Sequence, residues 1–305
     1  MSQLIPLLPL LVVGLGGFIL MLVDAFSDDT SELATLSSVI LFAGGAIAAV
    51  LATGKAGVYA PLPAVAPFLA TSGMAQFFNA TICFGGGLSA LLAGGYLREH
   101  ALDRGEMYPL IVLSAFGAMV LAAATDLLSI FIGLETMSLG VYAMVAFRRG
   151  SPRAAEGGMK YFLLGSFAAA IFLFGAALLY GATGHTDLDG IGKAIAAPLP
   201  GMMLRVAVLG MLLVLIGLAF KISAAPFHMW TPDAYEGAVT PATTFMSVVV
   251  KAAAFAVLVR VITACFSDEG SASLVTGWPA MISVLAAITM IYGNLAAATQ
   301  SSVKR

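Results

Sequence analysis

Charge is the scarcest property of this sequence of 305 residues. Only 10% of the residues are Asp, Glu, Lys or Arg, and 60% are hydrophobic, whereas a soluble domain carries about 25% charged residues. Fourteen basic and sixteen acidic side chains cannot cover the surface of a water-soluble protein of 31.3 kDa. The net charge of −2 gives no reason to expect nucleic acid or a strongly charged substrate. The composition therefore excludes a soluble enzyme and predicts a protein surrounded mostly by lipid.

Cysteine and histidine are also scarce. Cys83 and Cys265 lie far apart, within or at the end of apolar runs, so they predict neither a disulfide framework nor a metal cluster. We interpret both as small apolar packing residues. The three histidines, His100, His185 and His228, do not place two ligands on one helix, and no glycine-rich phosphate loop occurs. We therefore expect no redox cofactor and no metal site on this chain.

Long apolar runs make up most of the sequence. A transmembrane helix needs about 20 mostly apolar residues, and strands of a membrane barrel would instead alternate polar and apolar residues. The first run lacks a basic flank and a cleavage site, so we expect it to be a span rather than a signal peptide. The sequence predicts an all-α polytopic membrane protein with about nine transmembrane helices. The nine runs are 4–23, 33–52, 74–97, 107–125, 127–147, 160–181, 204–221, 240–264 and 274–299.

The basic residues of the connecting loops predict an orientation. If successive runs cross the membrane in opposite directions, one side collects seven basic residues and the other collects four. Short loops rich in Lys and Arg stay in the cytoplasm, so the amino terminus is expected outside. The larger group is Arg98, Arg104, Arg148, Arg149, Arg153, Lys304 and Arg305, and the smaller group is Lys55, Lys193, Arg205 and Arg260.

Four charged residues lie within or at the ends of these runs. A charge at the bilayer centre costs at least about 2.5–3.5 kcal/mol, so such residues indicate a buried polar pathway. Glu135 and Lys251 lie near the middle of their runs, and Lys221 ends its run. The alternative is a Glu–Lys pair that only holds two helices together. Lys160 begins its run, where its side chain could also reach the lipid headgroups, and we interpret Asp126 as a helix-start residue.

The sequence after the seventh run predicts a broken helix. Pro226 cannot donate a backbone hydrogen bond and would interrupt the helix just beyond Lys221. Residues 231–233, Thr-Pro-Asp, are typical of an N-cap, a proline at the first helical position and an acid in the first turn. Discontinuous helices indicate ion sites in transporters. The alternative is a surface loop in which Trp230 and Tyr235 are interface anchors.

Buried lysine and glutamate suit proton movement. Burial favours the neutral form of each, whereas pairing favours both charged forms, so a lysine beside a movable carboxylate can hold or release a proton. His228 is a candidate relay because histidine titrates near neutral pH. The alternative is that His228 is a hydrogen-bonded packing residue beside Trp230.

Three stretches, 126–147, 159–184 and 219–260, resemble the antiporter-like membrane subunits of respiratory complex I. Segment 228–237, His-Met-Trp-Thr-Pro-Asp-Ala-Tyr-Glu-Gly, is similar to the form found in N-type subunits. The related L and M subunits and the multisubunit sodium/proton antiporters usually carry His-x-Trp-Leu-Pro-x-Ala-His there. Val239 stands where the family usually has proline, and we expect this local change to be tolerated.

The resemblance implies roles for four residues. Glu135 matches the essential carboxylate of the family's fifth helix, Lys221 the lysine of the broken seventh helix and Lys251 the lysine of the eighth. Lys160 matches the lysine that opens the sixth helix. The implied fold is a pair of inverted five-helix repeats, each with one broken helix, linked by a polar axis of Lys, Glu, His and water.

The resemblance also implies a division of the chain. Residues 1–106 would form helices 1–3, residues 107–264 the first repeat with its break around 221–237, and residues 265–305 the start of a second repeat. The sequence stops where family members continue into several more helices. We expect either a fragment, a shortened subunit or a second chain that carries the remaining helices.

The implied function is proton translocation, driven by quinone reduction elsewhere in an NADH-quinone oxidoreductase. FMN, iron–sulfur clusters and quinone are expected on other subunits. The expected partners are the neighbouring antiporter-like and small membrane subunits, together with lipid, in a bacterial inner membrane with the amino terminus in the periplasm. Two alternatives stay open: a subunit of a stand-alone cation/proton antiporter, and a structural subunit that conducts no protons.

Overall fold

The computed structural model of the chain describes residues 2–26, 32–55, 62–197, 199–266 and 278–305. Apart from two isolated bridges, these residues form helices, turns and loops. Eight helical segments in the described ranges are long and apolar enough to cross a membrane, and a ninth apolar helix is shorter. The prediction of an all-α polytopic membrane protein is confirmed.

The spanning helices follow the predicted runs to within a few residues, with one exception. The sixth helix begins at Pro152, eight residues before the predicted start, because Ser151 caps it and Pro152 occupies its first turn. Residues 274–277 of the ninth run lie outside the described residues. The helices are α1 (Leu8–Phe26), α2 (Leu33–Val50), α3 (Gly73–Glu99), α4 (Met107–Ala123), α5 (Leu127–Val145), α6 (Pro152–Thr183), α8 (Gly201–Ile222), α10 (Thr240–Phe245), α11 (Lys251–Cys265) and α12 (Trp278–Ala298).

Several short elements were not predicted. A 3₁₀ helix covers Ser2–Leu7, and π-helical turns cover Leu51–Lys55 and Met246–Val250, the second joining α10 to α11 in one span. Helix α7 (Leu188–Ala196), which follows α6, was not predicted either, whereas α9 (Thr231–Gly237) is the helix whose start was predicted after the break. The sequence did not predict helix α7, because its nine residues are too few to form an apolar run of membrane-spanning length.

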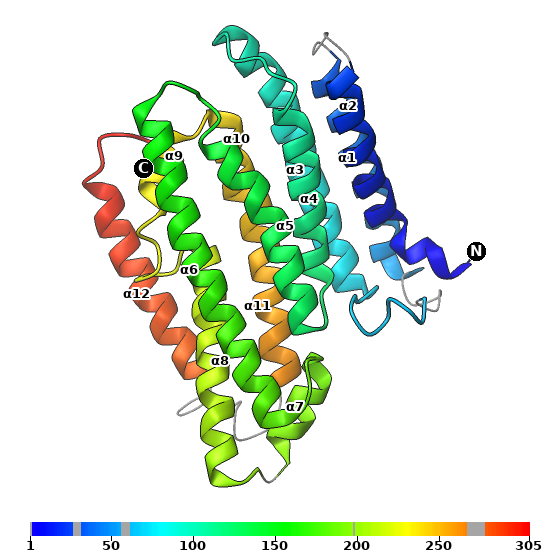
Figure 1. Ribbon diagram of the computed structural model, residues 1–305, viewed down its shortest axis with the longest axis vertical. Coiled ribbons are helices and arrows are strands. Elements are labelled where there is room, and N and C mark those ends of the chain that lie inside the picture. Colours follow the sequence, from blue (N-terminus) through cyan, green and yellow to red (C-terminus); the bar gives the residue numbers. More distant parts are fainter. Residues whose placement is uncertain (1, 27–31, 56–61, 198, 267–277) are drawn as a thin grey trace.

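The helices form a bundle in which chain neighbours mostly lie side by side (Figure 1). Helices α1 and α2 lie at one edge, α3, α4, α5 and α11 form the middle, and α6 and α8 pack together on the other side. Helix α12 lies at the edge opposite α1 and carries no buried residue. The α5, α8 and α11 segments, which carry three of the four charged residues singled out above, therefore approach one another inside the bundle.

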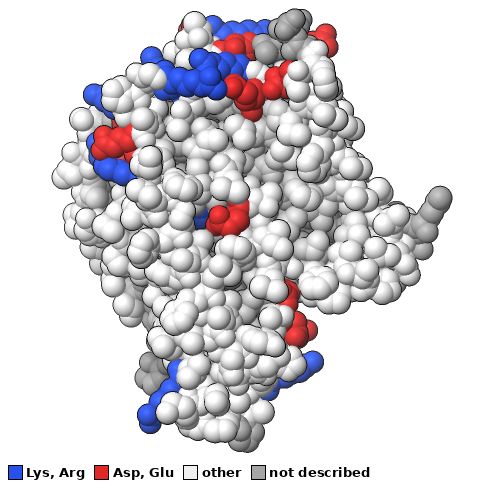
Figure 2. Space-filling view, viewed as in Figure 1, with Lys and Arg blue, Asp and Glu red and all other residues white. Residues whose placement is uncertain are grey.

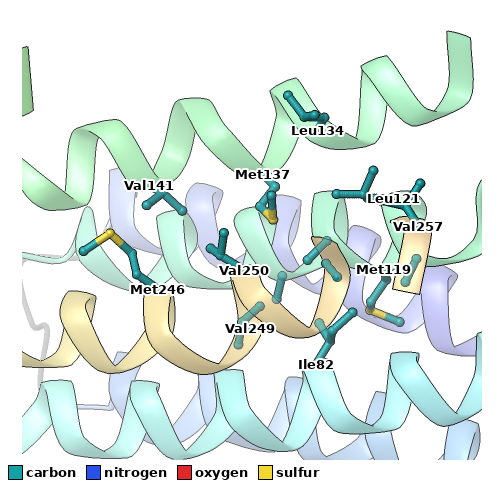
Figure 3. Close-up of a cluster of buried hydrophobic side chains, with 14 of the residues drawn as sticks. Ile82, Met119, Leu121, Leu134, Met137, Val141, Met246, Val249, Val250 and Val257 are labelled. Atoms are coloured by element: carbon teal, nitrogen blue, oxygen red, sulfur yellow. The ribbon is translucent and has the colours of Figure 1, made fainter. Parts of the chain in front are cut away.

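The apolar core lies where α3, α4, α5 and the α10–α11 span meet (Figure 3). Lipid offers no hydrophobic driving force between helices, so close packing holds them together. Gly133 shows how close the packing is, because a Cβ on this residue would lie 2.5 Å from the backbone nitrogen of Leu121. This contact fixes α5 against α4 beside Glu135. Core side chains include Ile82, Met119, Leu121, Leu134, Met137, Val141, Met246, Val249, Val250 and Val257.

Charged side chains gather at the two ends of the bundle, and one acidic side chain with a basic one beside it interrupts the uncharged middle (Figure 2). One end contains the ion pairs Arg149–Glu106, at 2.8 Å, and Arg305–Asp233, at 2.9 Å. Arg260 was counted with the basic residues of one side of the membrane, but it lies inside the predicted run 240–264. It lies within α11, where its Nη2 donates to the carbonyl of Ala122 at the end of α4.

Candidate functional site

One face of α5 carries three polar side chains near the middle of the membrane. Glu135, Ser138 and Tyr142 are spaced by three and four residues, which places them on one side of a helix. Asp126 caps the helix by accepting hydrogen bonds from the Leu128 and Ser129 amides, which confirms the predicted helix-start role. Glu135 lies nine residues further along, or roughly 13 Å, close to half of the ~30 Å hydrocarbon thickness.

Lys221 reaches this face from the last turn of α8. The residue is 1% exposed, and its Nζ donates to Ser138 Oγ at 2.7 Å and to Tyr142 Oη at 3.5 Å. The same nitrogen lies 5.3 Å from the ring centres of Tyr142 and Tyr161. The charge of Lys221 is therefore surrounded by hydroxyl oxygens and aromatic rings in the bundle interior.

Glu135 shares this neighbourhood without touching the lysine. No Lys, Arg or His nitrogen among the described residues lies within 4.0 Å of its carboxylate, and its Oε1 is buried with no hydrogen-bond donor. Lys221 is the charged group that acts on it electrostatically. The direct Glu–Lys pair considered from the sequence is not formed, because Ser138, one turn along α5, holds the ammonium group instead.

The predicted break after α8 is confirmed, but its details differ. Helix α8 ends at Ile222, Ser223 adopts a positive φ of 60°, and α9 begins at Thr231. Thr231 does not cap α9: the preceding residue, Trp230, is at the N-cap position, and the Thr231 hydroxyl donates to Ser223 Oγ at 2.9 Å. The Thr231 side chain therefore ties the two halves of the broken helix together.

The interpretation of Trp230 as an interface anchor is wrong. Trp230 is 1% exposed, and its Nε1 donates to the Phe220 carbonyl at 3.1 Å. Its ring stacks on Tyr161 with ring centres 4.1 Å apart, and Tyr235 packs against it edge to face. The sequence signal was ambiguous because a Trp near a proline-rich break is common at interfaces as well as in cores.

Lys251 binds the broken end of α8. Its Nζ donates to the Lys221 carbonyl at 3.0 Å and also to Ser223 Oγ. The last carbonyls of a helix lack partners within the helix and carry partial negative charge, so they suit an ammonium group. The π-helical turn Met246–Val250 ends just before Lys251, and such turns are frequent at functional sites.

Lys160 does not join the buried group. It lies two turns inside α6 with 44% of its side chain exposed, and its Nζ is 2.6 Å from Glu156 Oε1 and 2.7 Å from Asp233 Oδ2. Arg305 Nη2 binds the other oxygen of Asp233 at 2.9 Å. Lys160 therefore belongs to the charged end of the bundle, where it joins α6 to α9.

His228 links the break to α12. Its ring packs edge to face on Tyr292, with ring centres 4.9 Å apart, and its buried Nδ1 has no hydrogen-bond partner among the described residues. Nearby, the Ala225 amide donates to Thr289 Oγ1 at 3.1 Å. The structure therefore shows no hydrogen bond at Nδ1 to the described residues.

Three predicted residues, Glu135, Lys221 and Lys251, thus lie in one region of the bundle, where Ser138 binds Lys221 and the Lys221 carbonyl binds Lys251. Sequence reasoning missed Ser138 and Tyr142, although their helical spacing from Glu135 could have suggested them. Within the described ranges, no group of three or more His, Cys, Asp or Glu side chains could hold a metal ion. The arrangement can hold positive charge in the membrane interior and offers an unpaired carboxylate as a proton acceptor.

The chain is similar to known membrane proteins. NADH-quinone oxidoreductase subunit N 1 of Sorangium cellulosum is 52% identical and covers 97% of this chain, which covers 61% of that protein. The chain spans about three fifths of the length of the curated relatives that it matches.

Two solved structures share the fold. A chain of respiratory complex I from Thermus thermophilus, solved with bound aureothin, matches with a TM-score of 0.77 and 32% identity over 97% of this chain and 60% of that one. The Mrp complex from Dietzia sp. matches with a TM-score of 0.75, covering 98% of this chain and 54% of that one, and at 21% identity it supports the fold alone. The family model described as NADH:quinone oxidoreductase/Mrp antiporter, transmembrane, matches residues 124–305, and the chain belongs to this family.

Proposed function

We propose that this chain is part of a proton-translocating, N-type membrane subunit of an NADH-quinone oxidoreductase, and that Glu135, Lys221 and Lys251 carry the protons. The observation that carries the proposal is the ammonium group of Lys221, which is buried at 1% exposure and bound by a serine rather than a carboxylate. The names of the relatives, at up to 52% identity, support the complex I assignment.

The transfer step follows from the positions of the two groups. When the Lys221 Nζ leaves Ser138 and approaches Glu135, an N–H bond breaks, an O–H bond forms, and the electron pair stays on nitrogen. Both side chains then become neutral, which the membrane interior tolerates better than separated charges. The neutral lysine can be recharged from Lys251, whose ammonium group lies against the Lys221 carbonyl. Each charge moved across the membrane corresponds to about 2.3 kcal/mol per 100 mV.

The other predicted residues occupy the ends of this route. His228 is the proposed relay from the break toward α12, because its Nδ1 is buried and unpartnered. Lys160 is proposed to act at the charged end, where its two carboxylate partners compete for its protons.

The remaining assignments concern the complete enzyme. FMN, iron–sulfur clusters and quinone are proposed to bind other subunits, because the chemistry proposed for this chain needs only proton carriers. The neighbouring antiporter-like and small membrane subunits are the proposed partners. The excess of basic residues at one end supports a bacterial inner-membrane location with the amino terminus in the periplasm.

A subunit of a cation/proton antiporter is the second candidate, since the family description names both kinds of complex. The neighbouring genes distinguish them, because a complex I operon also encodes flavin and iron–sulfur subunits. Sodium-dependent proton exchange without NADH oxidation would favour the antiporter.

The test is proton pumping per NADH oxidised by the purified enzyme in sealed vesicles. We expect Glu135→Ala and Lys221→Ala to lower this ratio while the complex still assembles. Lys193→Ala, which changes an exposed lysine of α7, is the matched control and should pump normally. Normal pumping by both variants of the buried residues would refute the assignment and favour a structural subunit.

A further inference from the structure

A continuous aromatic cluster lies beside Lys221, which is buried, and Lys251, which is half-buried. It contains Tyr142 from α5, Tyr161 from α6, Phe220 from α8, Trp230 from the break and Tyr235 from α9. Tyr161 and Trp230 form its centre, because their rings are nearly parallel, with an interplanar angle of 9° and centres 4.1 Å apart. Tyr142 meets Tyr161 edge to face at 4.7 Å.

Each lysine places its ammonium group over this cluster. The Lys221 Nζ lies 5.3 Å from the Tyr161 ring centre, and the Lys251 Nζ lies 5.0 Å from the Trp230 ring centre. Both distances fall inside the ~6 Å range of cation–π attraction, which strengthens when the groups are desolvated. Tyr161 is 0% exposed, Trp230 1% and Lys221 1%, so water does not weaken the contact of Lys221, whereas Lys251 is half-buried.

Aromatic rings, rather than carboxylates, lie next to the ammonium groups of the two lysines. Neither Lys221 nor Lys251 has a carboxylate within 4.0 Å among the described residues. Hydroxyl and carbonyl oxygens bind the two Nζ atoms instead, with Ser138 on one lysine and Ser223 on the other. An aromatic face attracts an ammonium group without accepting a proton from it, so the lysine stays charged and its protons stay available.

We propose that the stacked Tyr161–Trp230 pair is a positioning element that holds protonated Lys221 and Lys251, one on each ring, and so sets the pH range in which both lysines carry charge. The consequence for pumping rests on the proposed function, but the contacts themselves can be tested without it.

The direction of the effect follows from the groups that face the lysines. These are Glu135 and Tyr142 on α5, Tyr161 on α6, and each lysine for the other. Among them, the Glu135 carboxylate favours a charged Lys221, and a charge on one lysine disfavours a charge on the other. If the attraction of the rings is weakened, the lysines therefore lose their protons at lower pH. The pH above which the enzyme stops pumping should then be lower as well.

The experiment replaces Tyr161 with phenylalanine and then with 4-fluoro-, 3,5-difluoro- and 3,4,5-trifluorophenylalanine in the complete enzyme. Tyr161→Phe is the reference for the fluorinated series, because every member lacks the hydroxyl, which is buried without a hydrogen-bond partner among the described residues. Fluorine keeps the shape of the ring but withdraws the electron density that attracts a cation. Substitution of fluorotryptophan at Trp230 repeats the test at Lys251.

Two readouts separate the inference from the proposed function. Across the series we expect the pH of half-maximal pumping on the alkaline side to fall by about 0.5–1 unit in total. We also expect the trifluoro variant to melt below the Phe variant at low pH, with the difference disappearing at alkaline pH where the lysines are neutral.

A melting difference that depends on pH, without any change in pumping, would support the ring contacts and count against the proposed function. A melting difference that is the same at all pH values, or none at all, would overturn the inference, because a purely structural ring has no pH-dependent contact to lose.

Discussion

Ser138→Ala is the sharpest test of how the buried lysine is held. The substitution removes the Oγ atom that accepts a hydrogen bond from Lys221 Nζ at 2.7 Å. The remaining hydroxyl acceptor, Tyr142 Oη, is 3.5 Å away, at the limit of a useful hydrogen bond. The buried ammonium group thus loses its principal hydroxyl partner while the shape of the core changes little.

The expected magnitude follows from that single bond. A hydrogen bond to a charged group contributes about 1.5–3 kcal/mol, and each pH unit corresponds to about 1.36 kcal/mol. The charged form of Lys221 is therefore disfavoured by about one to two pH units. The alkaline limit of proton pumping should move to lower pH by this amount, and the assembled complex should melt at a lower temperature at neutral pH.

The assay measures pumping per NADH oxidised between pH 6 and 9, with Ser283→Ala as the matched control. Both serines donate to the carbonyl four residues earlier in their own helix, Leu134 for Ser138 and Pro279 for Ser283, and no lysine bond to the exposed Ser283 is present among the described residues. If Ser138→Ala moves the alkaline limit no further than the control does, the hydroxyl does not stabilise the charged lysine and the reasoning fails.

Three further predictions concern other parts of the bundle. Lys160→Ala should lower pumping per NADH less than Glu135→Ala or Lys221→Ala does, because its ion pairs are exposed and water can replace it at the charged end. A loss of pumping as large as that of Glu135→Ala would contradict this. Gly133→Ala should destabilise the fold by about 1–3 kcal/mol and reduce the yield of complex, because its new Cβ would lie 2.5 Å from a backbone nitrogen of α4. Gly181→Ala is the control, because Gly181 faces open space, and it should give a normal yield of complex. The pKa of Asp187 lies below its ordinary value, mainly because the Gly190 amide donates to its carboxylate; its stabilisation of α7 is therefore present above about pH 4 and lost as pH falls through the lowered pKa. Hydrogen exchange of α7 should show this acid-induced loosening in the native chain and not after Asp187→Asn.

The sequence predicted the membrane spans well because a span depends on a local property. About 20 consecutive apolar residues are enough to cross the bilayer as a helix, and no partner is needed to satisfy the backbone. The late predicted start of α6 shows the limit of this reasoning. The first two turns, which include Arg153 and Glu156, are too polar to belong to an apolar run, yet Ser151 and Pro152 begin the helix there.

The buried charges were predictable for a related reason. Glu135, Lys221 and Lys251 stand out because charge inside an apolar run is costly, and the proline-rich segment after α8 predicted the break. The N-cap of α9 was assigned one residue too late, because Thr-Pro at a helix start fits either Thr231 or the residue before it as the N-cap. In the structure the Thr231 hydroxyl binds Ser223 instead of capping the helix.

By itself, the sequence determined that this chain is a bundle of membrane helices with charges buried at mid-depth and one interrupted span. Only the tertiary structure decided which groups meet: Lys221 binds Ser138, which is 83 residues away in the sequence, rather than Glu135, and Trp230 stacks on Tyr161 inside the bundle. The physical reason is that hydropathy depends on each segment alone, whereas contacts depend on the rotation and depth of every helix relative to its neighbours. Small residues such as Gly133 set those relations through backbone contact, which no local pattern encodes.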